Sequence, residues 1–244
     1  MTTNIVVFEA NDIGQRDYNQ DYYLHAIHDN FSCFVVADGL GGHEHGEIAS
    51  KALCHALVDE AKAHADEIKI APLEGMKLYL QQAHQLMCQR ILQEQGDIDT
   101  HTTVVLLWIN DSAMITAHVG DSRIYRINNK AVIWRTPDHT YVQALFEDGA
   151  LTDDEMGQHP GQNQLLRTVN IHEPLDVDVF VHPPLNQDET VVLCSDGFWT
   201  GTPLATMVEM ANRQDYELAF KERIAFLAQN PFADNITVQV VKRI

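Results

Sequence analysis

The sequence is poor in cysteine and has no long hydrophobic run. Its four cysteines are scattered over 244 residues without a C-x-x-C pair: Cys33, Cys54, Cys88 and Cys194. Structural zinc and a disulfide framework are therefore not expected. No apolar segment approaches the roughly 18 residues that span a bilayer. These absences lead us to expect a reduced, soluble protein of the cytoplasm with no membrane partner.

Positive charge is also scarce. Lys and Arg number 16 against 35 Asp and Glu, so the formal net charge is −19. A field of this sign disfavours nucleic acid and anionic membrane surfaces and favours cations. Most of the acidic residues are expected to form a solvated surface.

Several common binding motifs are missing. The turn Gly39-Leu40-Gly41-Gly42 fits neither G-x-G-x-x-G nor the P-loop pattern, so nucleotide binding is not supported. The histidines, among them His45, His139 and His159, do not show a zinc spacing such as H-E-x-x-H. We expect them to be surface or hydrogen-bonding residues.

What the chain does contain is a set of five aspartates at the ends of strand-like runs. Three of them end such runs: Asp38 ends SCFVVAD, Asp121 ends MITAHVGD and Asp196 ends TVVLCSD. Asp234 lies at the start of ADNITVQVV, and Asp21 follows the polar turn RDYNQ. One such Asp is ordinary turn chemistry. If the strands lie side by side, five would meet at one sheet edge and repel each other unless divalent cations neutralise them. The pattern predicts a hard-cation site built from oxygen ligands.

Hydrophobic periodicity predicts groups of strands separated by pairs of helices. Strands are expected at residues 4–10, 21–28, 32–38, 102–110, 113–120, 123–128, 131–136, 175–182, 189–196 and 235–242. One helix pair runs from Glu47 to about Ile68 and from about Leu73 to Gln95, and another pair begins near Pro203 and Asp215. Strands joined by short turns imply antiparallel pairing, and a parallel dinucleotide-binding fold would need strict alternation. We expect an α+β fold: a four-layer αββα sandwich of two packed antiparallel sheets flanked by helix pairs.

The length of the chain is most simply that of one domain, residues 1–244, although length alone also allows two small domains. A polar segment at about residues 139–169 differs from its surroundings and contains two short helical stretches. Gly149 would close the first stretch, and Thr152 with Glu155 has capping-box spacing for the second. We expect this segment to form a flap on the domain surface.

Taken in order, the motifs resemble those of the type 2C metal-dependent protein phosphatases, the PPM family, in their bacterial form. The resemblance runs from about Gly14 to Val241. The matching stretches are Gly14-Gln15-Arg16, Asn19-Gln20-Asp21, residues 38–43 (DGLGGH), residues 46–50 (GEIAS), Thr102-Thr103, residues 120–125 (GDSRIY), residues 136–140 (TPDHT), residues 193–197 (LCSDG) and residues 234–237 (DNIT). The order and number of these motifs make the resemblance specific.

The resemblance implies two Mn²⁺ or Mg²⁺ ions in an oxygen-rich site, which suits the octahedral preference of both metals. Asp38 should bridge the ions, with the Gly39 carbonyl on one of them. Asp196 and Asp234 should complete the shell of the first ion, while Asp21 acts on the other side, largely through ordered water.

Arg16 is the phosphate clamp that the resemblance implies, because its guanidinium fork matches phosphate oxygens; the alternative is a plain surface arginine. Asp121, with Asp196, should hold a weaker third ion. Thr200 stands where the family often has another Asp, so this ion would be loosely held. His43 is a candidate general acid, but it would equally suit a role in orienting the turn or the substrate, and water on a metal is the other proton source.

The resemblance therefore implies a serine/threonine protein phosphatase that uses metal-activated water and opposes a Ser/Thr kinase, with phosphorylated proteins as partners. The sequence has no C-x₅-R motif, which argues against a cysteine-nucleophile phosphatase. Two alternatives stay open. One is a non-catalytic phosphoprotein-binding regulator, although such a protein would be expected to lose Asp38, Asp196 or Asp234. The other is a metal-dependent hydrolase of small phosphorylated metabolites.

Overall fold

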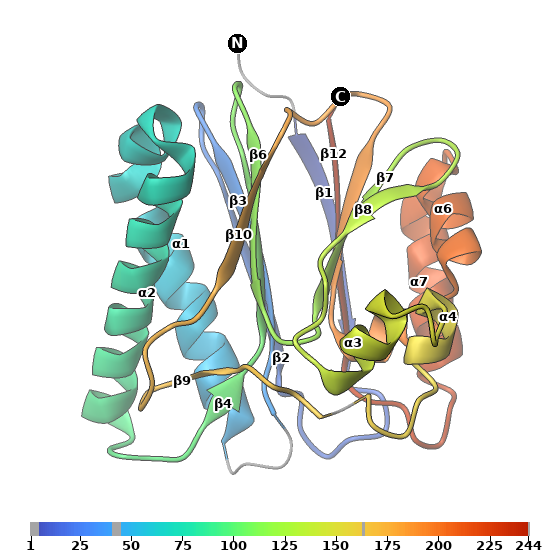
Figure 1. The fold of residues 1–244 in the computed structure, drawn as a ribbon, viewed down its shortest axis with the longest axis horizontal. Helices are drawn as coiled ribbons and strands as arrows, with labels where there is room; N and C mark the ends of the chain where they lie inside the picture. Colours follow the sequence, from blue (N-terminus) through green and yellow to red (C-terminus); the bar gives the residue numbers. More distant parts are fainter. Residues whose placement is uncertain (1–4, 41–44, 163, 244) are drawn as a thin grey trace.

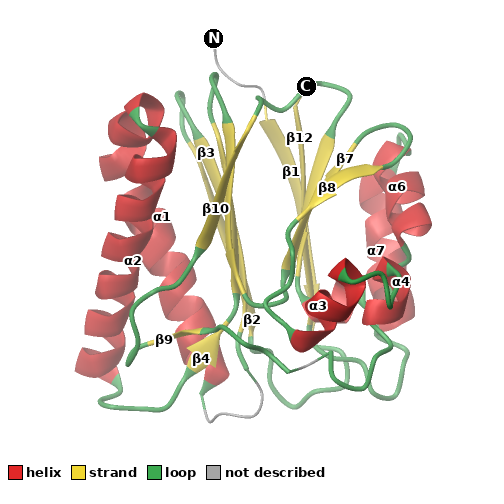
Figure 2. Cartoon of the chain, in the orientation of Figure 1, coloured by secondary structure: helices red, strands yellow, loops and turns green. Residues whose placement is uncertain are grey.

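The computed structural model describes residues 5–40, 45–162 and 164–243. Two five-stranded antiparallel sheets lie face to face, and pairs of helices cover their outer faces (Figure 1, Figure 2). The expected α+β fold with four layers is confirmed.

The first sheet has the order β1-β12-β11-β7-β8, and α6 and α7 cover it. Its elements are β1 (Ile5–Asp12), β7 (Arg123–Ile127), β8 (Val132–Arg135), β11 (Thr190–Cys194), β12 (Ile236–Arg243), α6 (Leu204–Asn212) and α7 (Tyr216–Leu227).

The second sheet has the order β10-β6-β5-β3-β2, and the long helices α1 and α2 cover it. Its elements are β2 (Asp21–Ile27), β3 (Ser32–Asp38), β5 (Val104–Ile109), β6 (Met114–Val119), β10 (Asp178–His182), α1 (Gly46–Ile70) and α2 (Pro72–Glu94). The sequence did not predict the small sheet of β4 (His101–Thr102) and β9 (Val169–Asn170).

Three hydrophobic clusters hold the layers together. One lies between the second sheet and α1 and α2, and one lies between the first sheet and α6 and α7. The third joins the two sheets and includes Phe34, Leu107 and Leu193, all fully buried. Every residue of β5 and β6 is buried because one face of their sheet meets helices and the other meets the opposite sheet.

The flap segment contains α3 (Tyr141–Glu147) and α4 (Asp153–Met156), as expected. Gly149 follows α3 with a φ of 74°, a conformation that a glycine adopts without steric cost. The capping box between Thr152 and Glu155 is present at α4. Both helices lie near the end of the sheets that is drawn at the bottom of Figure 1.

Strands that follow each other closely do not always pair. The expected antiparallel pairing holds for β2 with β3, β5 with β6, and β7 with β8. It fails for β6 and β7, because the three residues from Gly120 to Ser122 carry the chain from one sheet to the other. The sequence predicted that the aspartates would meet at the edge of one sheet. They lie instead at the common end of two facing sheets.

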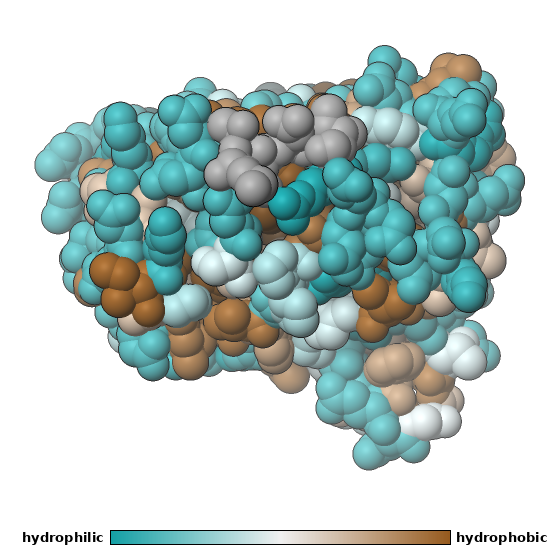
Figure 3. Space-filling model, turned by 90° about the horizontal axis from the view of Figure 1, so that it is seen from above, coloured by the Kyte–Doolittle hydropathy of each residue, from teal (hydrophilic) through white to brown (hydrophobic). Residues whose placement is uncertain are grey.

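The end of the molecule opposite to the aspartates, drawn at the top of Figure 1, is where β1 begins and β12 ends. It presents a mostly hydrophilic surface with smaller hydrophobic patches (Figure 3). Within the described residues, no helix combines the length and the apolar composition that crossing a bilayer requires.

Candidate metal and phosphate site

The five aspartates come from both sheets. Antiparallel pairing of β2 with β3 places Asp21 directly opposite Asp38. Asp196 opens the short helix α5 (Asp196–Trp199) just after β11, and Asp234 lies just before β12. Asp121 lies in the crossing between β6 and β7. All five are therefore at the lower end of the sheets in Figure 1.

The carboxylates are close enough to perturb one another. Burial raises the pKa of Asp38 well above its ordinary value, and the negative charges of the other four aspartates raise it further. Burial also raises the pKa of Asp196 to about 7, with the Asp234 and Asp21 charges adding to the shift. Asp121 has a pKa well above the ordinary value, first through burial and then through Asp196. Such a cluster is unstable as a set of anions and is suited to cations.

Asp21 carries the clearest sign that this cluster suits a cation. Its Oδ2 accepts a hydrogen bond of 2.6 Å from Ser195 Oγ, whereas its Oδ1 is buried and has no hydrogen-bond partner. Burial raises the pKa of Asp21 to about 6, against the lowering effect of the Ser195 bond. A buried carboxylate oxygen without a donor costs free energy unless a metal ion or a metal-bound water meets it. The oxygen donors of this site therefore fit Mg²⁺ or Mn²⁺.

The backbone around Asp38 is held on both sides. Asp38 N donates to Thr103 Oγ1 at 3.1 Å, and Asp38 O accepts from Thr103 N at 2.8 Å and from Thr102 Oγ1 at 2.9 Å. The next residue, Gly39, lies so close to Gly46 that an added Cβ would stand 2.3 Å from the Gly46 carbonyl oxygen. Only glycine allows the two backbone segments to approach this closely beside the carboxylate.

Arg16 lies at the rim of the aspartate cluster. Its Nη2 donates to Asp234 Oδ2 at 2.7 Å, and 54% of its side chain is exposed. The Asn235 side chain ties the Arg16 loop down, since it accepts from Gln20 N at 2.8 Å and donates to Ile13 O at 2.9 Å. Arg16 is thus not an isolated surface arginine, and its role as a phosphate clamp stays a prediction.

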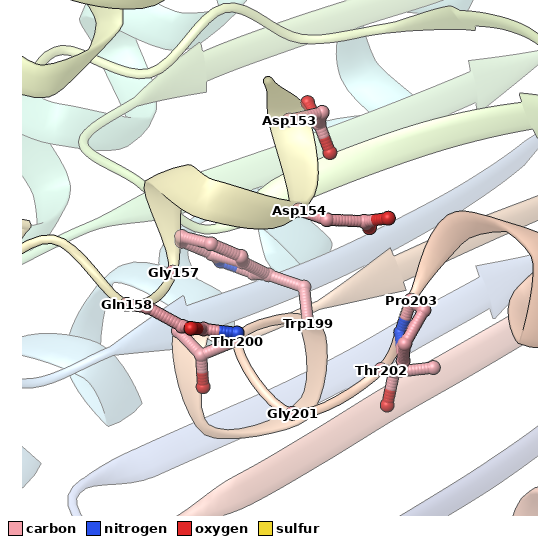
Figure 4. A pocket seen from close by; sticks show the side chains of 9 residues that line it. All are labelled: Asp153, Asp154, Gly157, Gln158, Trp199, Thr200, Gly201, Thr202 and Pro203. Carbon is pink, nitrogen blue, oxygen red and sulfur yellow. The ribbon is translucent and has the colours of Figure 1, made fainter. Parts of the chain in front are cut away.

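Thr200 is uncharged and adds no carboxylate to the aspartate cluster. It lines a pocket of about 210 Å³ between the flap and the start of α6 (Figure 4). The neighbouring Trp199 donates from Nε1 to the Asp121 carbonyl at 2.9 Å, and the Arg123 guanidinium lies 3.4 Å from the centre of its ring. Arg123 in turn donates hydrogen bonds of 2.8 and 2.6 Å to Asp138, so its side chain has a structural role.

A second group of possible ligands lies where β6 pairs with β10. One ligand atom each of His118, His139 and Asp178 fall within 4.8 Å of one another. Arg167 already occupies this group, because its Nη1 pairs with Asp178 at 3.1 Å and its Nη2 contacts His139. His139 accepts from Gly120 N at 3.1 Å, as expected of a hydrogen-bonding histidine. The arginine neutralises the one carboxylate of this group, so it is a poor cation site.

Similarity to known proteins extends over almost the whole chain. A family model described as Protein phosphatase 2C matches residues 10–239. The chain belongs to the protein phosphatase 2C family.

Two relatives illustrate the similarity within this family. The serine/threonine phosphatase stp of Listeria monocytogenes serotype 4b is 32% identical over 221 residues, which cover 88% of this chain and 86% of the relative. The protein phosphatase PhpP of Streptococcus pneumoniae serotype 2 is 32% identical over 238 residues, or 94% of each chain.

Solved structures of phosphatases share the fold. The serine/threonine phosphatase of S. agalactiae has a TM-score of 0.80 at 27% identity and covers 98% of this chain and 100% of its own. The catalytic domain of the phosphatase PstP, solved in complex with 2 manganese ions, has a TM-score of 0.76 at 22% identity and covers 98% of each chain.

Three polar side chains that organise the site in this protein phosphatase 2C chain were not predicted from the sequence. Ser195 donates a hydrogen bond to Asp21, and Trp199 donates one to the Asp121 carbonyl. Asn235 fixes the loop that carries Arg16. Ser195 and Asn235 directly adjoin Asp196 and Asp234, so that adjacency was the available signal. His43 lies outside the described residues, and its role as a general acid stays a prediction.

Proposed function

We propose that this protein is a metal-dependent serine/threonine protein phosphatase that hydrolyses phosphoserine and phosphothreonine in proteins. The observation that carries the proposal is the cluster of perturbed aspartates beside an exposed arginine, in a chain of the protein phosphatase 2C family. We also propose that residues 1–244 form one catalytic domain, with a flap at about residues 139–169.

Asp38, Asp196, Asp234 and the Gly39 carbonyl are the groups we assign to two Mn²⁺ or Mg²⁺ ions, with Asp21 acting through water. When bound, such a pair of ions lowers the pKa of the attacking water and offsets phosphoryl charge. Asp121 would share a weaker third ion with Asp196.

The side chains of this protein have separate tasks in that scheme. Arg16 binds phosphate oxygens through its guanidinium fork, and its pairing with Asp234 keeps it at the mouth of the site. Ser195 orients Asp21, and the Thr102 and Thr103 bonds fix the Asp38 backbone. His43 is the candidate proton donor to the leaving hydroxyl.

Phosphorylated proteins are the proposed substrates, and a Ser/Thr kinase of the cytoplasm would be the opposing enzyme. The stp and PhpP relatives, which are named as phosphatases, support this assignment. The net charge of −19 supports the absence of nucleic acid and anionic membranes among the partners.

The proposal predicts metal-dependent turnover. The protein should hydrolyse p-nitrophenyl phosphate and a phosphothreonine peptide with Mn²⁺ or Mg²⁺, and EDTA should abolish both activities. Asp38→Ala and Asp196→Ala should each lower kcat by about a hundredfold or more, because the ions lose essential ligands. Arg16→Ala should mainly raise KM, by about tenfold.

Asp188→Ala is the matched control, since Asp188 is exposed in the turn before β11, at the other end of that strand from Asp196. Full activity in EDTA, or unchanged rates in the Asp38 and Asp196 variants, would refute the assignment. Binding of the peptide without turnover would indicate the regulator, and a strong preference for sugar phosphates would indicate a metabolite hydrolase.

A further inference from the structure

Three large apolar side chains are exposed around the Arg16–Asp234 ion pair. Phe232 is 90% exposed, Tyr18 is 76% exposed and Ile13 is 42% exposed. We call these three residues the apolar rim. Leaving a phenylalanine almost fully in water gives up the free energy of its burial, so a binding role is a reasonable explanation when several such groups gather at one place.

The rim is built on two loops that are fastened to each other. Gln15 N donates to Ala233 O at 3.0 Å, and the Asn235 amide donates to Ile13 O and Tyr18 O at 2.9 and 3.1 Å. The Phe232 backbone is itself fixed, since its N–H donates to the Asn230 side chain at 3.0 Å. The backbone that carries the rim is therefore held in place before any ligand binds, which reduces the entropy cost of binding.

The position of the rim relative to Arg16 suggests its ligand. Tyr18 and Ile13 are two and three residues from Arg16, and Phe232 is two residues from Asp234, the ion-pair partner of Arg16. A side chain next to a phosphorylated residue in an extended peptide lies only about 3.3 Å further along the backbone per residue. A substrate whose phosphate meets Arg16 thus brings its neighbouring side chains to the rim.

We propose that the apolar rim of Ile13, Tyr18 and Phe232 binds an apolar side chain adjacent to the phosphoserine or phosphothreonine of a protein substrate. This inference rests on the proposed function, and it adds a preference for the sequence around the phosphorylated residue. An anionic membrane is the less suitable occupant, because the exposed Asp17 stands between Arg16 and Tyr18 and the net charge is −19.

The test compares two phosphothreonine peptides that are identical except for Leu or Ser on both sides of the phosphorylated residue. With Mn²⁺, the unmodified protein should favour the Leu peptide in kcat/KM by about fivefold, as expected for partial burial of a leucine. Phe232→Ser and Tyr18→Ser should each bring this ratio towards one. The measured quantity is the ratio of the two kcat/KM values, because a change in activity that affects both peptides equally leaves this ratio unchanged.

Ile70→Ser is the matched control. Ile70 is 83% exposed at the end of α1, which lies at the opposite end of the molecule from the cluster, so the ratio should not change (Figure 1). A ratio of one in the unmodified protein, or an unchanged ratio in both rim variants, would overturn the inference while leaving the phosphatase intact. Failure to hydrolyse either peptide or p-nitrophenyl phosphate with Mn²⁺ would instead overturn the proposed function and this inference with it.

Discussion

Asp38 is the residue on which the repulsion within the site converges. Burial holds the pKa of Asp38 well above its ordinary value, and the negative charges of the other four aspartates all raise it further. Asp38→Asn removes one buried negative charge at a similar side-chain volume. In EDTA at pH 7.5 we therefore expect the variant to be more stable than the unmodified protein, by about 1 to 3 kcal/mol in the free energy of unfolding.

The same variant should lose the stabilisation that Mn²⁺ gives to the unmodified protein, because binding to the folded state alone raises stability. Thermal unfolding with EDTA and with Mn²⁺ measures both effects. The exposed Asp188→Asn should change neither value. A less stable Asp38→Asn protein in EDTA would show that the carboxylate serves the fold rather than the metal.

Residue types at strand ends were enough to predict that these five aspartates come together, but not which side chains orient them. The aspartates could be found because each follows or precedes a run of strand residues. The Ser195 bond to Asp21 and the Trp199 bond to the Asp121 carbonyl join residues that are 174 and 78 positions apart. Such contacts depend on how the two sheets pack, which sequence periodicity does not encode.

At the scale of elements, the helices and most strands followed from periodicity, whereas their grouping into sheets followed only in part, as in the pairs β2 with β3, β5 with β6 and β7 with β8. The three-residue connection between β6 and β7 has the length of a hairpin turn, yet these strands belong to different sheets. β10 pairs with β6 although about sixty residues separate them. The four residues of α5 are too few to give a helical pattern.

The junction of β6, β10 and the loop before α3 should respond to pH. His118 on β6 is fully buried, and burial lowers its pKa to about 4, with a further lowering from His139. The groups facing it are His139, Asp178 and Arg167, and the net effect keeps His118 neutral at pH 7. The unfolded chain binds this proton near pH 6.5, so stability should be full above that pH and fall between pH 6.5 and about 4.

The His118 contribution over that window should be about 2 to 3 kcal/mol. Urea unfolding of the unmodified protein and of His118→Asn at several pH values gives the free energy of unfolding as a function of pH. The contribution of His118 is the difference between the slopes of these two pH dependences. His172→Asn is a suitable control, because His172 is exposed. Parallel slopes for the unmodified protein and His118→Asn would show that this histidine does not titrate with unfolding.

At the scale of the whole molecule, the aspartate site depends on both sheets keeping their relative position. Asp21 and Asp38 belong to one sheet, whereas Asp196 and Asp234 adjoin strands of the other. The inter-sheet cluster with Leu107 and Leu193 therefore helps to keep these aspartates together. A site of this kind is expected in a chain that unfolds as one unit.

Two core truncations test that expectation. Leu107→Ala weakens the inter-sheet cluster, and Leu57→Ala weakens the outer cluster under α1. Each should cost about 2 to 5 kcal/mol, since both side chains are buried. If residues 1–244 are one domain, either variant should shift a single urea transition that is the same by circular dichroism and by tryptophan fluorescence. Two separate transitions, with Leu57→Ala moving only one, would mean that each sheet folds with its own helices, and the metal ions would then be needed to bring the two halves of the site together.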